Sequence, residues 1–235
     1  MLSEKPWKVD AVALLLAGLL FCWSFGILLT VILGQWLQPG SPQDPAFHQF
    51  LLTAVSFHGA ALVLVTRFLK AHEGRWKEFL GLVGPRLRRA LVIAVVAGAI
   101  MVPAALALNK GCGWLLEHVS VEPVEQRTVK ILQVSVGWPR RILFGLGAIV
   151  LAPLVEETLF RGILYPFLKP RIGLPLAVTA TSLVFAAIHT NLVTFVPLTF
   201  IGLVLVWVYE RTDNLLAPIV THALFNAVNF VMLVR

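Results

Sequence analysis

Charged residues are scarce in this sequence. Asp, Glu, Lys and Arg make up 13% of the 235 residues, whereas soluble domains carry roughly 25%. Hydrophobic residues make up 58% of the chain, and the mean hydropathy is +0.86. A composition this poor in charge and rich in apolar residues excludes an ordinary water-soluble domain. We therefore expect an integral membrane protein.

Cysteine is also rare, and several common sequence patterns are missing. Cys22 and Cys112 are too few for a disulfide framework, and Cys22 lies in an apolar run where we expect it to be buried. The net charge of +7 is not gathered in a Lys/Arg tract or joined to an aromatic RNA-binding motif. Basic residues beside membrane spans explain this charge better, and we expect no nucleic acid partner.

The apolar runs predict an all-α fold, a polytopic transmembrane helical bundle. A helix needs about 20 apolar residues to cross the hydrocarbon core. The first run is too long for a signal-peptide core and lacks a convincing cleavage site, so we expect a retained span. About seven spans are expected, within a range of six to eight: residues 11–37, 47–69, 90–108, 142–168, 174–189, 192–209 and 215–234.

No internal repeat or low-complexity tract divides the chain, so residues 1–235 are expected to form a single integral membrane domain. Residues 1–140 would hold the variable N-terminal spans and an amphipathic loop. Residues 141–235 carry the polar motifs described below. His48 and His58 have no acidic partner nearby in the sequence and are expected to be packed or interfacial histidines.

The connecting segments differ in composition. Residues 38–46 form a Pro/Gly-rich turn, and within 109–141 the stretch 124–136 has the pattern of an amphipathic surface helix. The segment 70–89 is rich in Lys and Arg, and its pattern is that of a helix lying in the headgroup region. It serves as a cytoplasmic charge anchor or, as the alternative, in phospholipid binding. The interleaved apolar residues are Trp76, Phe79, Leu80 and Leu82.

The basic loops also predict an orientation. The N-terminus, the 70–89 segment, Lys169, Arg171 and Arg211 would lie on the cytoplasmic side. The 109–141 segment carries five basic residues and would then fall on the opposite side, against the usual bias. Compact loops favour a prokaryotic protein, and we therefore expect a multi-pass protein of the plasma membrane with a cytoplasmic N-terminus.

The most unusual stretch of the sequence is APLVEETLFR, residues 152–161. A charged residue near the bilayer centre costs about 2.5–3.5 kcal/mol on insertion scales, so two adjacent carboxylates need a partner, water or a function. Glu157 and Arg161 are four residues apart and share one face of a helix. Glu156 lies about 100° around that helix and has no local partner. One carboxylate is thus expected to be neutralised and the other to be available for chemistry.

Two further polar pairs occur in the apolar C-terminal runs. Phe185 and His189 are four residues apart, as are His222 and Asn226. The pairs can serve as interhelical hydrogen bonds, but such bonds contribute only about 0.6 kcal/mol on average. Structure alone is a weak reason for so many of them. Because intramembrane polar residues face the bundle interior or water, we expect them to converge with the acid pair on one cavity.

These three segments, EETLFR, FAAIH and HALFN, occur in that order on three predicted spans. They resemble the motifs EExxxR, FxxxH and HxxxN of the CAAX-protease and bacteriocin-processing family of intramembrane endopeptidases, also called ABI proteins, which includes the Ras-converting-enzyme-like proteases. The resemblance extends from about Arg141 to the C-terminus. The N-terminal half resembles the family only in being hydrophobic.

The resemblance implies a fold, an activity and residue roles. Family members are helical bundles, and residues 141–235 would be the catalytic core of a glutamate-dependent peptide hydrolase. Glu156 and His189 match the residues that activate a water molecule, and His222 and Asn226 match those that hold the oxyanion. Glu157, Arg161 and Phe185 match supporting positions. The implied partners are the lipid bilayer and a membrane-associated peptide or protein, such as a prenylated protein or a C-terminal sorting tail.

Two alternatives remain open at this stage. Glu156, His189 and His222 are a residue set that can ligate zinc, although no HExxH motif is present and we expect no cofactor. A non-catalytic role in bacteriocin immunity, transport or binding would use the same polar cluster without cleavage. A serine or cysteine mechanism is poorly supported, because the sequence has no GxSxG motif and Cys112 lies outside the motif spans.

Overall fold

The three-dimensional structure is a computed structural model that describes residues 7–36, 51–84, 86–120, 129, 132 and 137–234. Every regular element in these ranges is a helix, which confirms the predicted all-α class. The predicted turn at 38–46 and His48 lie outside the described residues. The predicted amphipathic helix at 124–136 also lies outside them, apart from Val129 and Leu132.

The described residues form a series of mostly apolar helices. In this described part of the chain, six helical segments are long and apolar enough to cross a membrane, and α10 is a shorter apolar helix of 14 residues. This agrees with the predicted bundle of about seven spans and makes the chain a multi-pass integral membrane protein. The elements are α1 (Val9–Trp36), η2 (Val55–Gly59), α3 (Ala60–Ala71), α4 (Trp76–Phe79), α5 (Leu87–His118), α7 (Trp138–Leu146), η3 (Gly147–Leu151), α8 (Ala152–Leu159), η4 (Phe160–Leu164), α9 (Tyr165–Ile172), α10 (Leu174–Ala187), α11 (Leu192–Thr212) and α12 (Leu216–Val234).

Helix α5 differs most from its predicted span, which ended at residue 108. It runs without interruption for 32 residues to His118, about 48 Å at 1.5 Å per residue. The polar residues after Leu108 do not stop it, because helical hydrogen bonds tolerate Asn, Lys and single glycines in the interior. Pro103 lies inside the helix without ending it. The first part of the 109–141 segment is therefore helix rather than loop.

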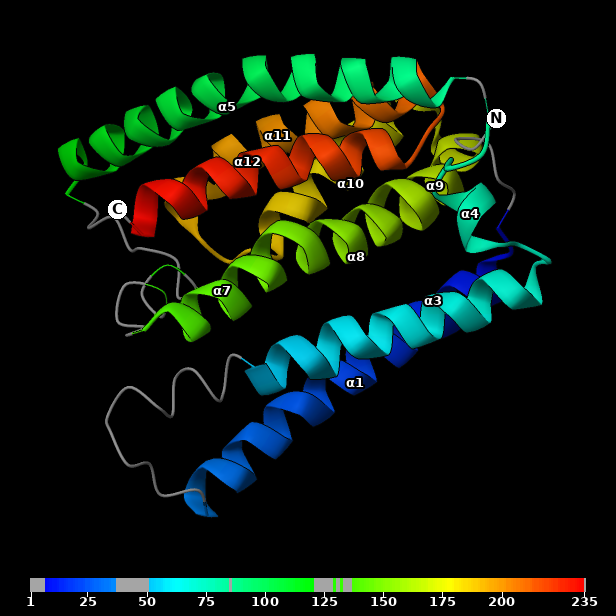
Figure 1. The fold of residues 1–235 in the computed structure, drawn as a ribbon, viewed down its shortest axis with the longest axis horizontal. Helices are drawn as coiled ribbons and strands as arrows, with labels where there is room; N and C mark the ends of the chain where they lie inside the picture. Colours follow the sequence, from blue (N-terminus) through cyan, green and yellow to red (C-terminus); the bar gives the residue numbers. More distant parts are fainter. Residues whose placement is uncertain are drawn as a thin grey trace.

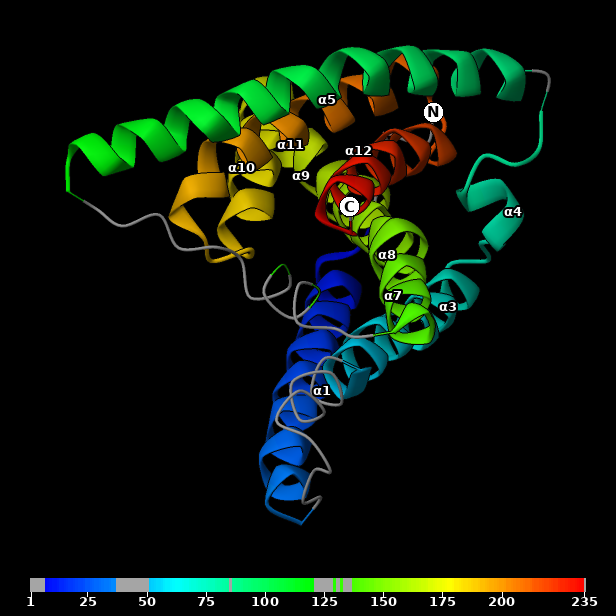
Figure 2. The same cartoon turned by 60° about the vertical axis from the view of Figure 1, so that its left-hand side comes forward.

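Helix α5 packs against α11 and α12, and α10 packs against α11. Figures 1 and 2 show these helices on one side of the molecule, with α12 between α5 and the rod formed by α7, α8 and α9. The pair α1 and α3 lies on the opposite side of that rod and leans away from the rest toward the end of α1. The three motif segments thus belong to the C-terminal bundle, as the sequence predicted.

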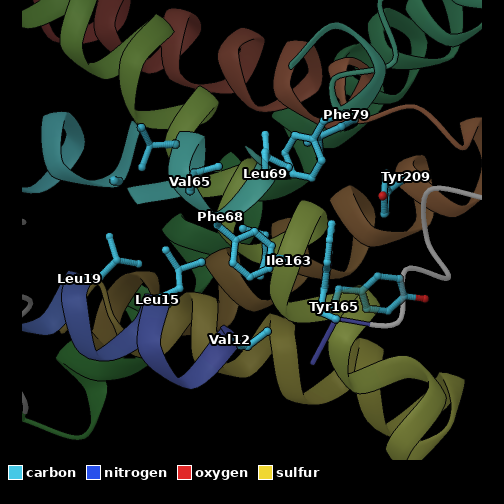
Figure 3. Close-up of a cluster of buried hydrophobic side chains, with 14 of the residues drawn as sticks. Val12, Leu15, Leu19, Val65, Phe68, Leu69, Phe79, Ile163, Tyr165 and Tyr209 are labelled. Atoms are coloured by element: carbon cyan, nitrogen blue, oxygen red, sulfur yellow. The ribbon is translucent and has the colours of Figure 1, made fainter. Parts of the chain in front are cut away.

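A cluster of buried apolar side chains joins the N-terminal pair to the C-terminal bundle. Figure 3 shows Leu15 of α1 and Phe68 of α3 facing Ile163 of η4. Phe79 of α4 enters the same cluster and is only 2% exposed. The helix α4 in the segment 70–89 has only four residues, and Phe79 packs into the protein interior instead of facing outward.

Two hydrogen bonds connect residues 80 and 81 of the basic segment 70–89 to the turn before α12. Asn214 donates through Nδ2 to the Gly81 carbonyl at 2.7 Å, and the Leu216 backbone N–H donates to the Leu80 carbonyl at 3.0 Å. Gly81 has a φ of +74° and lies so close to Asn214 that a Cβ would meet its side chain at 2.6 Å. A glycine is therefore required where the basic segment meets the C-terminal bundle.

Candidate active site

The acid pair lies on a helical rod of 35 residues, Trp138–Ile172, which contains two wider π-type turns. The turns η3 and η4 end directly before α8 and α9, whose second residues are Pro153 and Pro166. A proline has no N–H to donate to the preceding turn, and π-turns often mark such irregularities at functional sites. The two π-turns thus lie on either side of the acid pair, each directly before a proline-containing turn.

Glu157 and Arg161 form the predicted ion pair. Arg161 Nη1 donates to Glu157 Oε1 at 2.9 Å, and both side chains are fully buried. Arg161 also donates through Nη2 to the Gly202 carbonyl of α11 at 2.9 Å, and its guanidinium lies 4.8 Å from the ring centre of Phe185. The charge of Arg161 is therefore compensated by a carboxylate, a backbone carbonyl and an aromatic face.

His222 of α12 lies between the two glutamates. Its Nδ1 is 2.9 Å from Glu157 Oε1, and its Nε2 is 3.9 Å from Glu156 Oε2. Because Glu157 is ion-paired with Arg161, its carboxylate is the acceptor and Nδ1 of His222 carries the proton. In the neutral ring Nε2 is then an acceptor that faces Glu156. The Glu157 carboxylate orients His222 much as a buried acid orients a catalytic histidine.

Glu156 differs from its neighbour in having no such partner. Its side chain is 18% exposed, and its Oε2 is buried without a hydrogen-bond partner among the described residues. The gap of 3.9 Å to His222 is too long for a direct hydrogen bond, so this carboxylate oxygen is left open to a water molecule. The asymmetry predicted for the two carboxylates is present in the structure.

His189 joins the cluster through Phe185. Phe185 is fully buried, and its ring centre is 5.0 Å from that of His189 and 5.7 Å from that of His222. His189 lies in the turn after α10, where its Nδ1 is 2.7 Å from the Phe185 carbonyl. Since a carbonyl only accepts, Nδ1 of His189 carries the proton and Nε2 of the neutral ring keeps a lone pair. FxxxH thus brings one aromatic ring against both imidazoles.

Asn226 is one turn beyond His222 on α12 and contacts the motif rod at η3. Its Nδ2 donates to the Ala148 carbonyl at 2.7 Å, and its side chain is half-buried. This bond uses one of the two N–H groups of the amide. The second N–H and the Oδ1 atom are not used by this contact.

The zinc alternative was tested against this arrangement. The described residues contain no group of three or more His, Cys, Asp or Glu side chains that could hold a metal ion. Glu156, His189 and His222 are therefore not assembled as a ligand set, and Glu157, the other acid beside His222, is occupied by Arg161. We derive no step through a metal.

Two contacts at the site could not be predicted from side-chain identities. The Gly202 and Ala148 carbonyls accept bonds from Arg161 and Asn226, but a carbonyl is present at every residue and leaves no mark in the sequence. Pro153 and Gly202 are the only local signals, as a proline and a glycine inside predicted spans. Which carbonyl each side chain reaches depends on how the helices pack.

The fold and the site together define a class, namely a multi-pass helical membrane protein with a buried Glu–Arg–His cluster on three helical segments. Residues 138–228 match the family model described as type II CAAX prenyl endopeptidase Rce1-like. This match agrees with the predicted resemblance over the segment that carries all three motifs, and the matched family is a protease family.

A relative from Escherichia coli, described as an uncharacterized 24.3 kDa protein, is 39% identical over 89 residues. That match covers 36% of this chain and 41% of the relative. The chain thus matches less than half of the relative's length. No solved structure matches the chain significantly.

Proposed function

We propose that the chain is an intramembrane endopeptidase that hydrolyses a peptide bond of a membrane-associated substrate. In this proposal Glu156 is the general base, and no covalent intermediate forms. The observation that carries the proposal is the unpaired, buried carboxylate oxygen of Glu156, 3.9 Å from an imidazole that Glu157 holds in place. Glu157 is fully buried and ion-paired, whereas Glu156 is 18% exposed and has no ion-pair partner as close, so Glu156 is the acid of the pair that can accept a proton from water.

The first step uses one water molecule. Glu156 accepts its proton, while His189, with a lone pair on Nε2, accepts a hydrogen bond from the same water and helps to orient it. The oxygen of the water forms a bond to the carbonyl carbon of the peptide, and the π-electrons of the carbonyl move onto its oxygen. General base assistance of this kind contributes about 10²–10⁴ in rate.

The second step needs donors for the new oxyanion and a proton for the leaving group. His222 donates through Nε2 when its ring is protonated, and Asn226 donates through the N–H that Ala148 does not use. Removing one such donor typically costs about 10²–10³ in turnover. The proton held by Glu156 then passes to the amide nitrogen as the C–N bond breaks, which yields a carboxylic acid and an amine.

The experiment that tests the proposal compares membrane-protein termini in cells that carry wild-type or Glu156→Gln protein. The substitution preserves the shape of the side chain and removes its basicity, so we expect the wild-type-dependent termini to disappear while the protein level is unchanged. Glu117→Gln is the matched control, because Glu117 is an exposed acid near the end of α5 and should leave the termini as in wild type.

The same comparison of termini, extended to a chelator-treated sample and to cells without the chain, separates the alternatives. Full cleavage by the Glu156→Gln protein would contradict the proposal. Loss of cleavage on chelation, restored by added zinc, would support the metal-dependent alternative instead. Identical termini with and without the chain would favour a non-catalytic immunity or binding role. A prenylated protein and a C-terminal sorting tail are the two substrate classes to examine first, and new C-termini in the proteome would distinguish them.

A further inference from the structure

Two prolines of the motif rod have a common and unusual environment. Pro153 and Pro166 are each the second residue of an α-helical segment that follows a π-turn. Each lacks the N–H that would bond to a carbonyl one turn earlier. In both places a side chain from a distant part of the chain donates a hydrogen bond to a carbonyl of that earlier turn.

The first case concerns Asn226. The backbone N–H of Ala152 bonds to the Gly147 carbonyl, five residues earlier. The next bond in this π register would run from residue 153 to the Ala148 carbonyl, and Pro153 has no N–H to make it. The Nδ2 of Asn226 donates to that carbonyl at 2.7 Å. A side-chain amide of α12 thus replaces a missing backbone donor of the rod.

The second case concerns Trp7, which precedes α1. The backbone N–H of Tyr165 bonds to the Phe160 carbonyl, five residues earlier. The bond that Pro166 cannot make would therefore run to the Arg161 carbonyl in this π register, and to the Gly162 carbonyl in the α register of α9. The indole Nε1 of Trp7 donates to the Gly162 carbonyl at 3.3 Å. Trp7 is 5% exposed and packs edge-on against Phe68 with ring centres 4.8 Å apart. The bond therefore joins the N-terminal pair of helices to the π-turn that contains Arg161.

We propose that Pro153 and Pro166 are positioning residues that release the Ala148 and Gly162 carbonyls so that Asn226 and Trp7 can bind them. The proposal rests on the proposed hydrolase function only for the role of Asn226. An amide group is planar, so a bond from one N–H to Ala148 also sets the direction of the second N–H. Pro153 would in this way aim the oxyanion donor without touching the substrate.

A purely structural role for Pro153 makes a different prediction. Proline is unfavourable in a helix interior, so Pro153→Ala should raise the melting temperature and leave turnover unchanged. The positioning role also allows a higher melting temperature, because residue 153 regains an N–H for the Ala148 carbonyl. It requires, however, that kcat fall by at least about 10-fold, as expected when a donor is misplaced, with KM changed by no more than about twofold.

The test is a pair of double-mutant cycles on the full chain in detergent, read by thermal unfolding. Asn226→Ala should lower the melting temperature by roughly 2–4 °C in the wild-type background, as expected for one lost hydrogen bond in a chain of this size. In the Pro153→Ala background the same substitution should cost about 1 °C or less. Trp7→Phe should behave in the same way in the wild-type and Pro166→Ala backgrounds.

Two controls match these variants. Pro103→Ala removes an exposed proline from inside α5 and should leave the cost of Asn226→Ala unchanged. Asn229→Ala removes an amide that donates to the Phe225 carbonyl within α12, and its cost should be the same with and without Pro153. Both controls remove the same residue type without altering the contact to the rod.

Activity is measured on the peptide whose terminus depends on Glu156. Coupling between Asn226 and Pro153, together with the loss in kcat, supports the proposal. An equal cost of Asn226→Ala in both backgrounds, or an unchanged kcat in Pro153→Ala, overturns it. The thermal cycles do not use cleavage, so the lack of any Glu156-dependent product would count against the proposed function alone.

Discussion

Glu157 and Arg161 show at the scale of single residues why a charge pair is kept inside an apolar bundle. Both side chains are fully buried, and each has a second partner, His222 for the acid and the Gly202 carbonyl for the base. A buried ion pair adds little net stability, yet removing one member leaves an uncompensated charge. The pair is better explained as the support of His222 than as a source of stability.

The first residue-scale prediction concerns Arg161→Met. This change strands the Glu157 carboxylate in an apolar interior, so we expect a loss of about 3–5 kcal/mol in unfolding free energy and a loss of any Glu156-dependent cleavage. Thermal unfolding in detergent measures the first effect. The double variant Glu157→Gln/Arg161→Met removes both charges and should recover most of the stability. Equal melting temperatures for the single and double variants would contradict this account.

At the scale of the helices, the close approach of α10 and α11 positions one backbone contact of the active site. Gly202 of α11 faces Ser182 of α10 so closely that a Cβ at this position would lie 2.9 Å from the Ser182 Cβ and 3.0 Å from its Cα. Small residues permit such contacts between membrane helices. The same glycine offers its carbonyl to Arg161. The spacing of α10 and α11 is thus linked to the position of the ion pair.

For the packing of α10 against α11, we expect Gly202→Ala to destabilise the protein, because the new methyl group would meet the backbone and the side chain of Ser182. A cost of about 1–3 kcal/mol is typical for an overpacked interior. Gly111→Ala is the matched control, since its Cβ would meet nothing within 4 Å and alanine favours a helix over glycine by roughly 0.5–1 kcal/mol. The two variants should therefore shift the melting temperature in opposite directions, and a shift of the same sign in both would contradict the packing argument.

The whole molecule consists of a C-terminal bundle with the motifs and an N-terminal pair of helices joined to it mainly at one end. Phe79, buried against Gly162, is part of this junction. A Cβ on Gly162 would lie 2.5 Å from the Phe79 ring. The indole of Trp7 bonds to the Gly162 carbonyl from the same side. The N-terminal half thus supports the rod next to Arg161 although it contains no motif residue.

For the whole molecule we expect Phe79→Ala to lower the unfolding free energy by about 3–5 kcal/mol, the usual cost of removing a buried aromatic ring. Phe25→Ala is its control, because Phe25 is 50% exposed on α1 and should change stability by about 0.5 kcal/mol or less. Thermal unfolding of both variants in the same detergent measures the difference. An equal effect of the two substitutions would show that the junction does not depend on Phe79.

The predicted side of the membrane for each loop remains a prediction, and so does the plasma-membrane location. The distribution of basic residues supports a cytoplasmic N-terminus, with the 109–141 segment as the exception. The structure shows that part of this exceptional segment is not a loop, because residues 109–118 continue helix α5. The basic residue in this part, Lys110, therefore belongs to helix α5 and not to a connecting loop.

The sequence by itself determined the helical class, the approximate spans and the identity of the polar residues, because these follow from local apolar periodicity and from the cost of charge in a membrane. It also predicted the asymmetry of Glu156 and Glu157, since the helical spacing to Arg161 is a local property. Only the tertiary structure decided that His222 lies between the two acids and that Asn226 reaches Ala148. Those contacts depend on the packing of separate helices, and the acceptor for Asn226 is a backbone carbonyl, a group that every residue possesses.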